Sequence, residues 1–523
     1  MTDTYNFADM WEAVADAVPE RVALVHGDRT WTYADLEDRS NRAASAFRSR
    51  GVETGDHVGL HLFNGPAYVE AMLALIKLRA VPININFRFV AKEIEYMIDN
   101  ADLVGVVSEE DLAGPLDAAL GDRDLPVWRV PDNWEKALSA GSPARDYGPR
   151  SGDDLYVIYT GGTTGFPKGV MWRHEDLFFA GLQGGAPGGD PVSSHAELVE
   201  NAKDIDLALG VLPLAPFIHG STQFATWISH FTGGKVVLVD DRSLNPARTW
   251  ELAGREKVHT VNIVGDAMAR PLLDALEESG ADTWALEDLM VVASAGAVLS
   301  PSLRDRMQEL LPDAMVMNNF GSTETGHQGS AYPDEEPGPD NRPTFYMDEA
   351  NLVLDDDLKS VQPGSGVIGM LARRGRVPLG YYKDATKTAE RFKVIDGVRH
   401  VLPGDFATVL EDGRITVLGR GSVCINTGGE KVFPEEVEET LKAHPQVYDA
   451  VVVGIPDDRW MERVTAIVLP RSGTAPTLQD LVAHCREHIA GYKVPRKLVL
   501  VDDLQRTVSG KPDYAWAKEV AGR

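Results

Sequence analysis

The sequence contains very little cysteine. Cys424 and Cys485 are its two cysteines among 523 residues, so neither a disulfide framework nor a cysteine-based zinc site is expected. No stretch approaches the roughly 20 consecutive apolar residues that a membrane-spanning helix needs. The N-terminal segment also lacks the basic stretch and apolar run of a secretory signal. We therefore expect a cytoplasmic protein with reduced cysteines and no integral membrane segment.

Positive charge is also scarce. Lys and Arg number 51 against 79 Asp and Glu, which gives a formal net charge of -28. A chain this acidic is not expected to bind nucleic acid or anionic membranes in general, because both would repel it. A polyanionic ligand would need locally concentrated cations. The C-terminal end supplies such a group: Arg486, Lys493, Arg496, Lys497, Arg506, Lys511 and Lys518.

The length implies more than one domain. Apolar runs that are typical of buried strands alternate with amphipathic helical patterns, which predicts an α/β fold with layered sheets. The expected strands are 57–63, 103–108, 154–160, 235–240 and 289–295, and the expected helices include 34–50 and 68–78. Residues 184–205 interrupt this rhythm with glycine, proline and charge. We expect them to form a surface insertion with one helical turn near its end.

A second interruption lies at 419–434, where the chain is rich in glycine and has no regular period. The remaining residues show a compact helix–strand–strand–helix–strand pattern, which is enough for a small α+β domain. We therefore predict an N-terminal domain of residues 1–420 and a C-terminal domain of residues 421–523.

The segment YTGGTTGFPKG (159–169) is the most specific motif in the chain. Glycines allow backbone N–H groups to converge on phosphate oxygens, threonine hydroxyls add donors, and lysine adds a point charge. A P-loop nucleoside triphosphatase is excluded, because Pro167 precedes the lysine and Gly169 follows it. The alternative is a glycine-rich hairpin without a ligand. The candidate phosphate-binding residues are Thr160, Gly161, Gly162, Thr163, Thr164, Gly165 and Lys168.

Two further segments carry groups that suit a magnesium nucleotide. In NFGSTETG (319–326), Phe320 can stack on adenine, Thr323 can donate to a phosphate, and Glu324 can hold Mg²⁺. Asp405 can accept from both ribose hydroxyls, and Arg420 can donate to the ribose or a phosphate. Taken singly, each of these residues is equally typical of a helix cap, a turn or an exposed surface.

These motifs, in this order, resemble those of the adenylate-forming superfamily, which includes acyl-CoA synthetases, firefly-type luciferases and peptide-synthetase adenylation domains. The resemblance covers essentially the whole chain. It implies a large N-terminal adenylation domain of several subdomains, followed by a small mobile α+β domain. It also implies ATP, Mg²⁺ and coenzyme A as ligands, with Glu324 as metal ligand. The implied nucleotide-binding residues beyond the glycine loop are Gly296, Ala297, Phe320, Gly321, Ser322, Thr323, Asp405 and Arg420.

The resemblance assigns roles to four more places. Lys511, in RTVSGK, reaches from the small domain and stabilises charge on the reacting carboxylate and α-phosphate. Gly428 and Gly429 approach pantetheine after the small domain has rotated. His219 lies beside the acyl and pantetheine paths, although a buried core histidine is an equal alternative. Ser422 occupies a hinge position where the family usually carries Asp or Lys.

The acid is predicted to be large and hydrophobic. Relatives that activate acetate carry a bulky aromatic residue at the position of Gly321, so glycine there is expected to leave depth. The candidates for an apolar lining, each of which is also a candidate for plain core, are Phe224, Trp227, Val264, Met268 and Ala297. Several runs, including GDAMARPL, look closest to ligases of fatty acids and steroid side chains.

Two other functions stay open at this point. One is adenylation with a different acceptor, such as a carrier-protein thiol. The other is a nucleotide-binding regulator without chemistry, which the joint presence of Lys511, Glu324, Asp405 and Arg420 disfavours. The sequence does not decide between a monomer and a homodimer.

Overall fold

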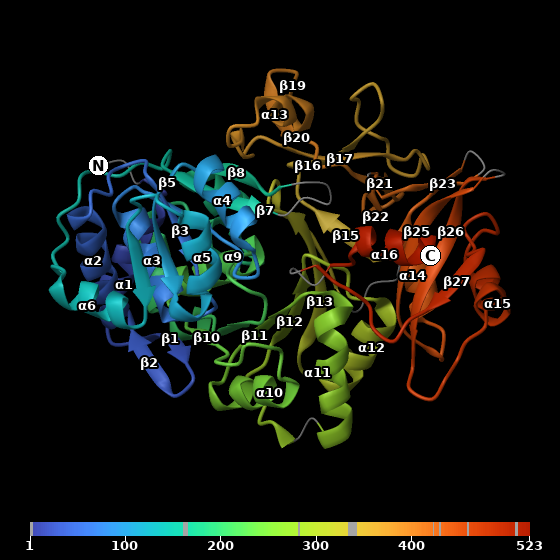
Figure 1. The fold of residues 1–523 in the computed structure, drawn as a ribbon, viewed down its shortest axis with the longest axis horizontal. Coiled ribbons are helices and arrows are strands. Elements are labelled where there is room, and N and C mark those ends of the chain that lie inside the picture. The colour runs from blue at the N-terminus through green and yellow to red at the C-terminus, as the bar shows by residue number, and fades with distance from the viewer. Residues whose placement is uncertain are drawn as a thin grey trace.

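The computed structural model describes residues 4–160, 166–280, 283–332, 343–421, 423–427, 430–457, 460–507 and 511–523, except for the side chains of Arg420 and Lys431. The chain runs from the N-terminal part at the left of Figure 1 to the C-terminal part at the right. Within the described residues, no helix is long and apolar enough to cross a membrane.

A fifteen-stranded sheet forms the centre of the described part of the chain. Its first half is mainly parallel, because helices connect its strands, and its second half is antiparallel. The first half contains β1 (Val22–His26), β2 (Arg29–Thr32), β9 (Val211–Pro213), β10 (Val236–Leu238), β11 (Thr260–Ile263), β12 (Val291–Ala295), β13 (Met315–Ser322) and β14 (Gly326–Ala331). The second half contains β15 (Thr344–Met347), β16 (Asn351–Leu354), β17 (Gly369–Arg374), β19 (Phe392–Ile395), β20 (Val398–Val401), β21 (Asp405–Val409) and β22 (Ile415–Arg420).

Two smaller sheets lie in the N-terminal part. A parallel sheet contains β3 (His57–His61), β4 (Val81–Asn84), β5 (Leu103–Glu109) and β6 (Val127–Val130). An antiparallel sheet contains β7 (Leu155–Thr160), β8 (Lys168–Arg173) and β18 (Gly380–Tyr381). The strands expected from apolar runs are therefore confirmed, and so is the α/β fold class.

Helices cover these sheets. They are α1 (Phe7–Ala17), α2 (Tyr33–Ser49), α3 (Pro66–Lys77), α4 (Ala91–Asn100), α5 (Ala113–Leu120), α6 (Asp132–Ala140), α7 (His174–Gly181), α8 (His195–Lys203), α9 (Gly220–Phe231), α10 (Pro246–Arg255), α11 (Gly265–Ser279), α12 (Pro301–Leu310) and α13 (Ala385–Arg391). Three short 3₁₀ turns are described at Glu110–Leu112, Gln183–Gly185 and Ile205–Leu207. Every residue of α3 from Ala67 to Lys77 is buried, because the helix packs between α1 and α2 on one side and β3 and β4 on the other.

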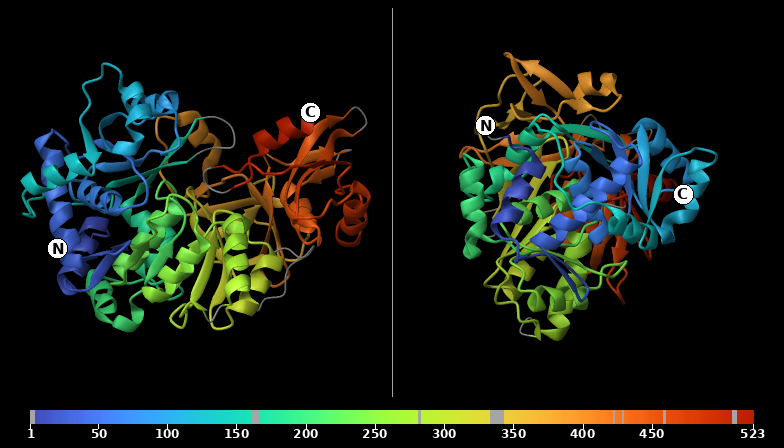
Figure 2. Two further views of the ribbon diagram at one scale, coloured as in Figure 1. Left: turned by 60° about the horizontal axis from the view of Figure 1, so that its bottom comes forward. Right: turned by 90° about the vertical axis from the view of Figure 1, so that its left-hand side faces the viewer.

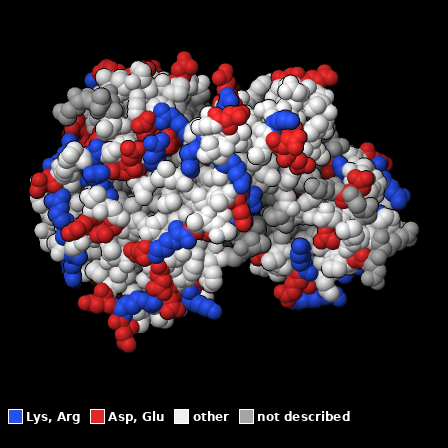
Figure 3. Space-filling model, turned by 90° about the horizontal axis from the view of Figure 1, so that it is seen from above, with Lys and Arg blue, Asp and Glu red and all other residues white. Residues whose placement is uncertain are grey.

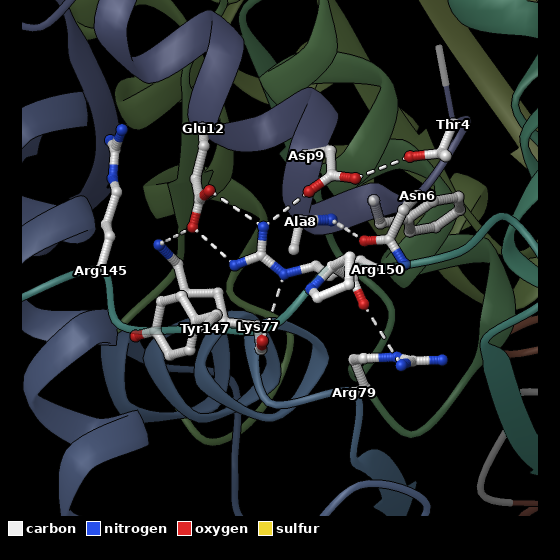
Figure 4. Close-up of polar contacts among 12 residues, drawn as sticks. Thr4, Asn6, Ala8, Asp9, Glu12, Lys77, Arg79, Arg145, Tyr147 and Arg150 are labelled. Carbon is white, nitrogen blue, oxygen red and sulfur yellow. Dashed lines mark hydrogen bonds and ion pairs between the residues drawn. The ribbon is translucent and has the colours of Figure 1, made fainter. Parts of the chain in front are cut away.

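A buried ionic network joins α1, α2 and α3 to the segment that leads into β7 (Figure 4). Lys77, at the end of α3, donates to Glu12 at 3.1 Å and to Glu37 at 2.6 Å. Arg150 donates to Glu12 at 2.9 Å and pairs with Asp9 at 2.6 Å. Because buried charges are tolerated only when they are paired, this network fixes the chain just before the predicted phosphate loop.

The expectation for residues 184–205 is wrong in part. This segment contains a full helix, α8, which packs against α1. Leu198 and Ala202 lie one helical turn apart on its buried face, and both join the main apolar core. Arg21 donates to the backbone oxygens of Ala202 and Lys203 at 2.7 and 3.0 Å and so caps the helix end. Glycine and proline mark only the start of this insertion.

The C-terminal part has its own sheet and core. The sheet contains β23 (Ile425–Thr427), β24 (Glu430–Val432), β25 (Val447–Asp457), β26 (Met461–Pro470) and β27 (Lys497–Leu500), and its helices are α14 (Pro434–Lys442), α15 (Leu478–His488) and α16 (Tyr514–Gly522). The predicted small α+β unit is therefore confirmed as a fold. Its predicted boundary at 420/421 falls between β22, in the large sheet, and β23, and it stays a prediction.

Glu438 makes the stability of this small unit depend on pH. Its side chain lies in the core beneath β25 and accepts from the amide of Val452 at 2.8 Å. Burial raises the pKa of Glu438 to about 7, although Lys442 opposes the shift. The native state therefore keeps its proton while the unfolded state loses it, and stability falls as pH rises from about 4.5 to 7.

Replacement of Glu438 by glutamine is expected to remove this loss of stability at higher pH. Glutamine keeps the acceptor for Val452 and carries no charge. At pH 8 we expect the variant to be more stable than the parent chain by about 2–3 kcal/mol, and at pH 4.5 to differ little. Denaturant unfolding at the two pH values measures this. Glu439→Gln, at the neighbouring position, is the control; a difference that does not change with pH would contradict the assignment.

Candidate active site

Two strands hold the ends of the predicted phosphate loop. β7 and β8 are antiparallel neighbours in which Thr160 lies opposite Lys168. On the far side of the loop, Phe166 stacks on Tyr96 with ring centroids 4.3 Å apart, and the Tyr96 hydroxyl donates to the Pro167 oxygen at 3.0 Å. The predicted phosphate ligands Gly161, Gly162, Thr163, Thr164 and Gly165 lie outside the described residues, so the structure fixes the two points between which this loop runs.

Lys168 is engaged by a carboxylate that the sequence did not single out. Its ammonium lies 2.6 Å from Asp384 Oδ2 and 5.7 Å from the ring centre of Tyr381. Asp384 caps α13 by accepting from the amide of Lys387 at 2.9 Å. The hydrogen bond from Lys168 lowers the pKa of Asp384, and the backbone contact adds to this. These contacts hold the Lys168 side chain at the first residue of β8.

Glu324 and Thr323 lie in the turn between β13 and β14, and each contacts an aromatic residue of the antiparallel sheet of β7, β8 and β18. The Tyr381 hydroxyl donates to Glu324 Oε1 at 3.0 Å, and the Trp172 indole of β8 donates to the Thr323 oxygen at 2.8 Å. Since the Tyr381 ring also lies beneath Lys168, the tyrosine brings Lys168 and Glu324 together. A predicted cation and a predicted metal ligand that are far apart in the sequence thus both lie next to Tyr381.

Gly321 has a local structural reason to be glycine. The pairing of β13 with β14 shifts register between Phe320 and Gly321. A Cβ atom at Gly321 would lie 2.1 Å from the oxygen of Gly326, which real side chains do not allow. The next residue, Ser322, closes the turn with its amide donating to Thr325 Oγ1 at 2.9 Å. The expectation that Gly321 deepens an acyl pocket stays a prediction, because the backbone already requires glycine here.

The predicted adenine contact Phe320 and the predicted nucleotide-binding residues Gly296 and Ala297 lie on or beside neighbouring strands. Ala295 is paired with Asn319, so Gly296 and Ala297 follow β12 beside Phe320 on β13. Gly296 has φ +83° and open space where a side chain would stand. The Phe320 ring is half-buried and lies 5.4 Å from the Phe345 ring. The open space at Gly296 therefore lies next to the residue that carries the Phe320 ring.

The backbones of the two predicted ribose ligands are paired in register on neighbouring strands. Asp405 begins β21, Arg420 ends β22, and the two are opposite in register. The Gly421 amide then donates to the Gly404 oxygen at 3.1 Å, which extends the pairing up to the predicted hinge. Asp405 is buried, and the side chain of Arg420 lies outside the described residues. Their backbones are thus placed together by the sheet.

His219 and the candidates for an apolar lining differ in their surroundings. His219 is the N-cap residue of α9, and a Cβ at the following Gly220 would lie 3.6 Å from Thr323 Oγ1, so His219 borders the turn that carries Glu324. Trp227 is fully buried and donates to the Tyr156 hydroxyl at 3.1 Å, which is the environment of a core residue. The other four candidates for an apolar lining are described as follows: Phe224 is half-buried beside Gly181, Met268 is partly buried, Val264 is buried and Ala297 is half-buried.

Lys511 has an exposed side chain at the base of a turn in the C-terminal part. In Figures 1 and 2 the red segment between β27 and α16 extends from the C-terminal sheet toward the middle of the molecule. Within it, the Thr507 amide donates to the Lys511 oxygen at 2.8 Å. Ser422, Gly428 and Gly429 lie outside the described residues, so their predicted roles at the hinge and at pantetheine stay predictions.

Asn84 is a residue that sequence reasoning missed. Its side chain is buried at the end of β4, accepts from the Tyr159 amide at 2.8 Å, and donates to the oxygens of Tyr159 and Ile218, both at 2.7 Å. It thereby clamps the last residues of β7 to the residue before His219. The sequence did contain a signal for this role: Asn84 directly follows the apolar run VPI (81–83), and a polar residue in a buried strand needs hydrogen-bond partners.

Asn84→Ala is expected to destabilise the protein and loosen the site. Three backbone groups lose their partner in a buried place, at about 1–3 kcal/mol for each group left unsatisfied. We expect a loss of at least about 2 kcal/mol in the free energy of unfolding and a raised KM for ATP. Asn86→Ala, in the next turn, is the matched control. Unchanged thermal unfolding would show that water replaces all three contacts.

Comparison with known proteins assigns this constellation to a family. The model of the AMP-binding enzyme family matches residues 11–382, and that of the AMP-binding enzyme C-terminal domain matches residues 436–511. This chain belongs to the AMP-binding enzyme family. The predicted membership of the adenylate-forming superfamily is thereby confirmed. The matched ranges contain Lys168, His219, Glu324 and Lys511.

Relatives from two organisms match nearly the whole chain. A medium/long-chain-fatty-acid–CoA/3-oxocholest-4-en-26-oate–CoA ligase of Mycolicibacterium smegmatis is 46% identical over 98% of this chain and 96% of its own length. A 3-oxocholest-4-en-26-oate–CoA ligase of Rhodococcus rhodochrous is 45% identical over 99% of this chain and 96% of its own length. The predicted kinship with ligases of fatty acids and steroid side chains is confirmed.

Solved structures share the fold. The anthranilate CoA ligase AuaEII in complex with anthranoyl-AMP gives a TM-score of 0.85 at 22% identity, over 100% of this chain and 98% of that one. ATP-bound MatB from Rhodopseudomonas palustris gives 0.82 at 25% identity, over 99% and 98%. The apo form of MatB gives 0.74 with the same coverage. The present arrangement of the chain is thus more similar to the ATP-bound form of MatB than to its apo form.

Proposed function

We propose that this protein is an AMP-forming ligase that joins a hydrophobic carboxylic acid to coenzyme A through an acyl-adenylate. The meeting of Lys168 and Glu324 around Tyr381, at the end of the glycine-rich loop, carries the proposal. This arrangement supports the proposal because a magnesium nucleotide needs a cation and a carboxylate close together. The names of relatives that are 45–46% identical support CoA as acceptor.

In the first step, an oxygen of the acid attacks the α-phosphorus of ATP. The bond between the α-phosphorus and the bridging oxygen breaks, and pyrophosphate leaves. Lys168 screens the phosphates, and Lys511 stabilises the negative charge shared by the carboxylate and the α-phosphate. In the second step the CoA sulfur attacks the acyl carbon, and AMP leaves with the electron pair. Asp405 and Arg420 hold the ribose in both steps, and Phe320 with Gly296 and Ala297 holds the adenine.

The residues present fit Mg²⁺ as a nucleotide-bound ion. Within the described residues, no group of three or more His, Cys, Asp and Glu side chains could hold a metal by itself. Glu324 is half-buried and has one oxygen on Tyr381. This suits Mg²⁺, which proteins commonly bind through one or two carboxylates and substrate phosphates. When bound, the ion neutralises charge on the phosphates, and Glu324 is the residue that would hold it.

The acid we propose is a medium-chain, long-chain or steroid side-chain acid. The substrates in the relatives' names support this size, and the half-buried Phe224 beside the turn of Glu324 offers an apolar wall. We propose the cytoplasm as the protein's compartment, and either a monomer or a homodimer as its oligomeric state. On the face shown in Figure 3, basic side chains lie among acidic ones, which agrees with small-molecule substrates rather than nucleic acid.

A pyrophosphate-release screen tests the proposal. Acids of graded length and bulk, from acetate to steroid side-chain acids, are supplied with ATP, Mg²⁺ and with or without CoA. We expect the largest kcat/KM for medium-chain or larger acids and CoA-thioester only when CoA is present. Fastest turnover on acetate would refute the proposed acid. Acyl-AMP formation with no thioester would instead favour a carrier-protein or other acceptor, and no acyl-AMP at all would favour the inert regulator.

A further inference from the structure

A buried chain of alternating charges connects the two parts of the molecule. It consists of Asp266, Lys442, Asp449 and Arg506, and we call it the interdomain charge chain. Asp266 lies in the first turn of α11 in the large part. The other three belong to the small part: Lys442 ends α14, Asp449 lies on β25, and Arg506 precedes the turn of Lys511. Their side chains are between 4 and 16% exposed.

Each member contacts the next. Lys442 Nζ lies 3.2 Å from Asp266 Oδ2 and 3.8 Å from Asp449 Oδ1. Asp449 in turn forms an ion pair with the Arg506 guanidinium. Although burial opposes both charges, Asp266 and then Asp449 raise the pKa of Lys442, and Asp449 with Asp266 raises the pKa of Arg506. The interdomain charge chain thus alternates two carboxylates with two cations, and their formal charges cancel.

The large part holds its end of the chain firmly. Asp266 Oδ1 accepts from the Ser300 amide at 2.7 Å, three residues beyond the predicted nucleotide-binding residue Ala297. One turn further along α11, the Arg270 guanidinium lies 4.6 Å above the ring centre of Tyr448, the residue before Asp449. The small part thus docks on the first two turns of α11 through one ion pair and one cation–π contact.

The other end of the chain leads to Lys511. Arg506 is bridged to Pro512 across the base of the turn, and the Thr507 amide and hydroxyl both donate to the Lys511 oxygen, at 2.8 and 3.2 Å. The backbone of Lys511 is therefore fixed relative to Arg506. Arg506 is fixed relative to Asp449 by their ion pair, and Asp449 is linked through Lys442 to Asp266. The interdomain charge chain is therefore a continuous path of contacts from the start of α11 in the large part to the backbone of Lys511.

We propose that Asp266 and Lys442 are positioning residues for acyl-adenylate formation, acting through Arg506 on Lys511. This inference rests on the proposed function and deepens it. A buried charge that loses its partner is costly, whereas the complete chain is neutral and satisfied. Docking of the small part on α11 is therefore favoured only when Asp266 and Lys442 meet, and in that arrangement the turn of Lys511 is held in place. Thioester formation, for which the small part must rotate, does not need the contact.

The test separates the two half-reactions. Asp266→Asn keeps the acceptor for Ser300 and removes the charge, and Lys442→Met removes its partner. For each variant we expect the kcat of acid-dependent ATP–pyrophosphate exchange to fall about 10- to 100-fold at an unchanged KM for ATP. Thioester formation from supplied acyl-AMP should stay within about threefold. Lys442→Arg, which retains the charge, should keep adenylation within about threefold of the parent chain.

Three controls make the outcome decisive. In a Lys511→Ala background, Asp266→Asn should cause no further loss, because the effect passes through that lysine. Asp305→Asn, which removes an exposed carboxylate on α12, should leave both half-reactions unchanged. Equal loss of both half-reactions, additive loss in the Lys511→Ala background, or full adenylation by Asp266→Asn would each overturn the proposal.

Failure of the proposed function would be recognised separately. If the parent chain formed no acyl-AMP from any acid, the ligase assignment would fall. Amide hydrogen exchange without substrates then tests the docking contact by itself. Asp266→Asn should exchange at least about fivefold faster than Asp305→Asn in α14 and at residues 503–507. Equal exchange in the two variants would overturn the contact itself.

Discussion

Replacement of Lys511 by alanine is expected to slow acyl-adenylate formation about 10²- to 10³-fold. The reason is electrostatic: a cation aimed at the charge that develops between carboxylate and α-phosphate stabilises the transition state, and a single such donor contributes about this much. The second step has no such requirement, since Lys511 is proposed to leave when the small part rotates. Thioester formation from supplied acyl-AMP should therefore remain within about threefold of the parent chain.

The measurement is ATP–pyrophosphate exchange for the first step and rapid-mixing thioester formation for the second. Lys518→Ala, which removes an exposed lysine of α16 in the same part of the chain, is the matched control and should leave both steps unchanged. Lys511→Arg should recover part of the first step, since it keeps the charge. A variant that loses both steps equally would contradict the assigned role and indicate damage to the small part.

Replacement of Lys77 by methionine is expected to lower the free energy of unfolding by about 3–5 kcal/mol. The Lys77 side chain is fully buried and donates to Glu12, to both oxygens of Glu37 and to Asn41 (Figure 4 shows Glu12 and Lys77). Methionine fills a similar volume and leaves Glu37 with an uncompensated buried charge. Arg145 is its remaining cationic partner, at 2.7 Å.

The same substitution should change how stability depends on pH. Although burial opposes the charge, Lys77 and Arg145 lower the pKa of Glu37 to about 2 in the folded state. The stabilisation is therefore present above about pH 4.5 and is lost as pH falls toward 2. Without Lys77 the loss should begin at a higher pH.

Denaturant unfolding between pH 3 and 7 measures both effects. Lys136→Met, at an exposed position of α6, is the control. A variant of Lys77 as stable as this control would show that the buried network contributes nothing beyond its packing. Because the network fixes the segment before β7, we also expect Lys77→Met to raise the KM for ATP.

Much of the site could be predicted from the sequence because the motifs are local. The glycine loop, the turn of Glu324 and the strand pair of Asp405 and Arg420 each lie within short segments whose composition indicates their chemistry. The strand before the glycine loop was visible as the apolar run 154–160. The partners of these residues were not predictable, since Asp384 lies 216 positions from Lys168 and no local pattern links them.

The missed features share one cause. Asn84 contacts residues 75 and 134 positions away, and Asp266 meets a lysine of the other part of the chain. The helix α8 was missed for a related reason: its two buried residues form a weak pattern, and it is α1 that supplies the surface against which they pack. Contacts of this kind leave no periodic signal in the sequence.

The sequence by itself determined the family and the α/β fold class, and it predicted which residue types would carry phosphate, metal and ribose chemistry. These depend on hydrophobic periodicity and on groups that are close along the chain. Only the tertiary structure decided that Tyr381 joins Lys168 to Glu324, that the backbone at Gly321 excludes a side chain, and that Asp266 is linked to the turn of Lys511. Each of these depends on the approach of distant segments, which the packing of whole sheets and helices decides.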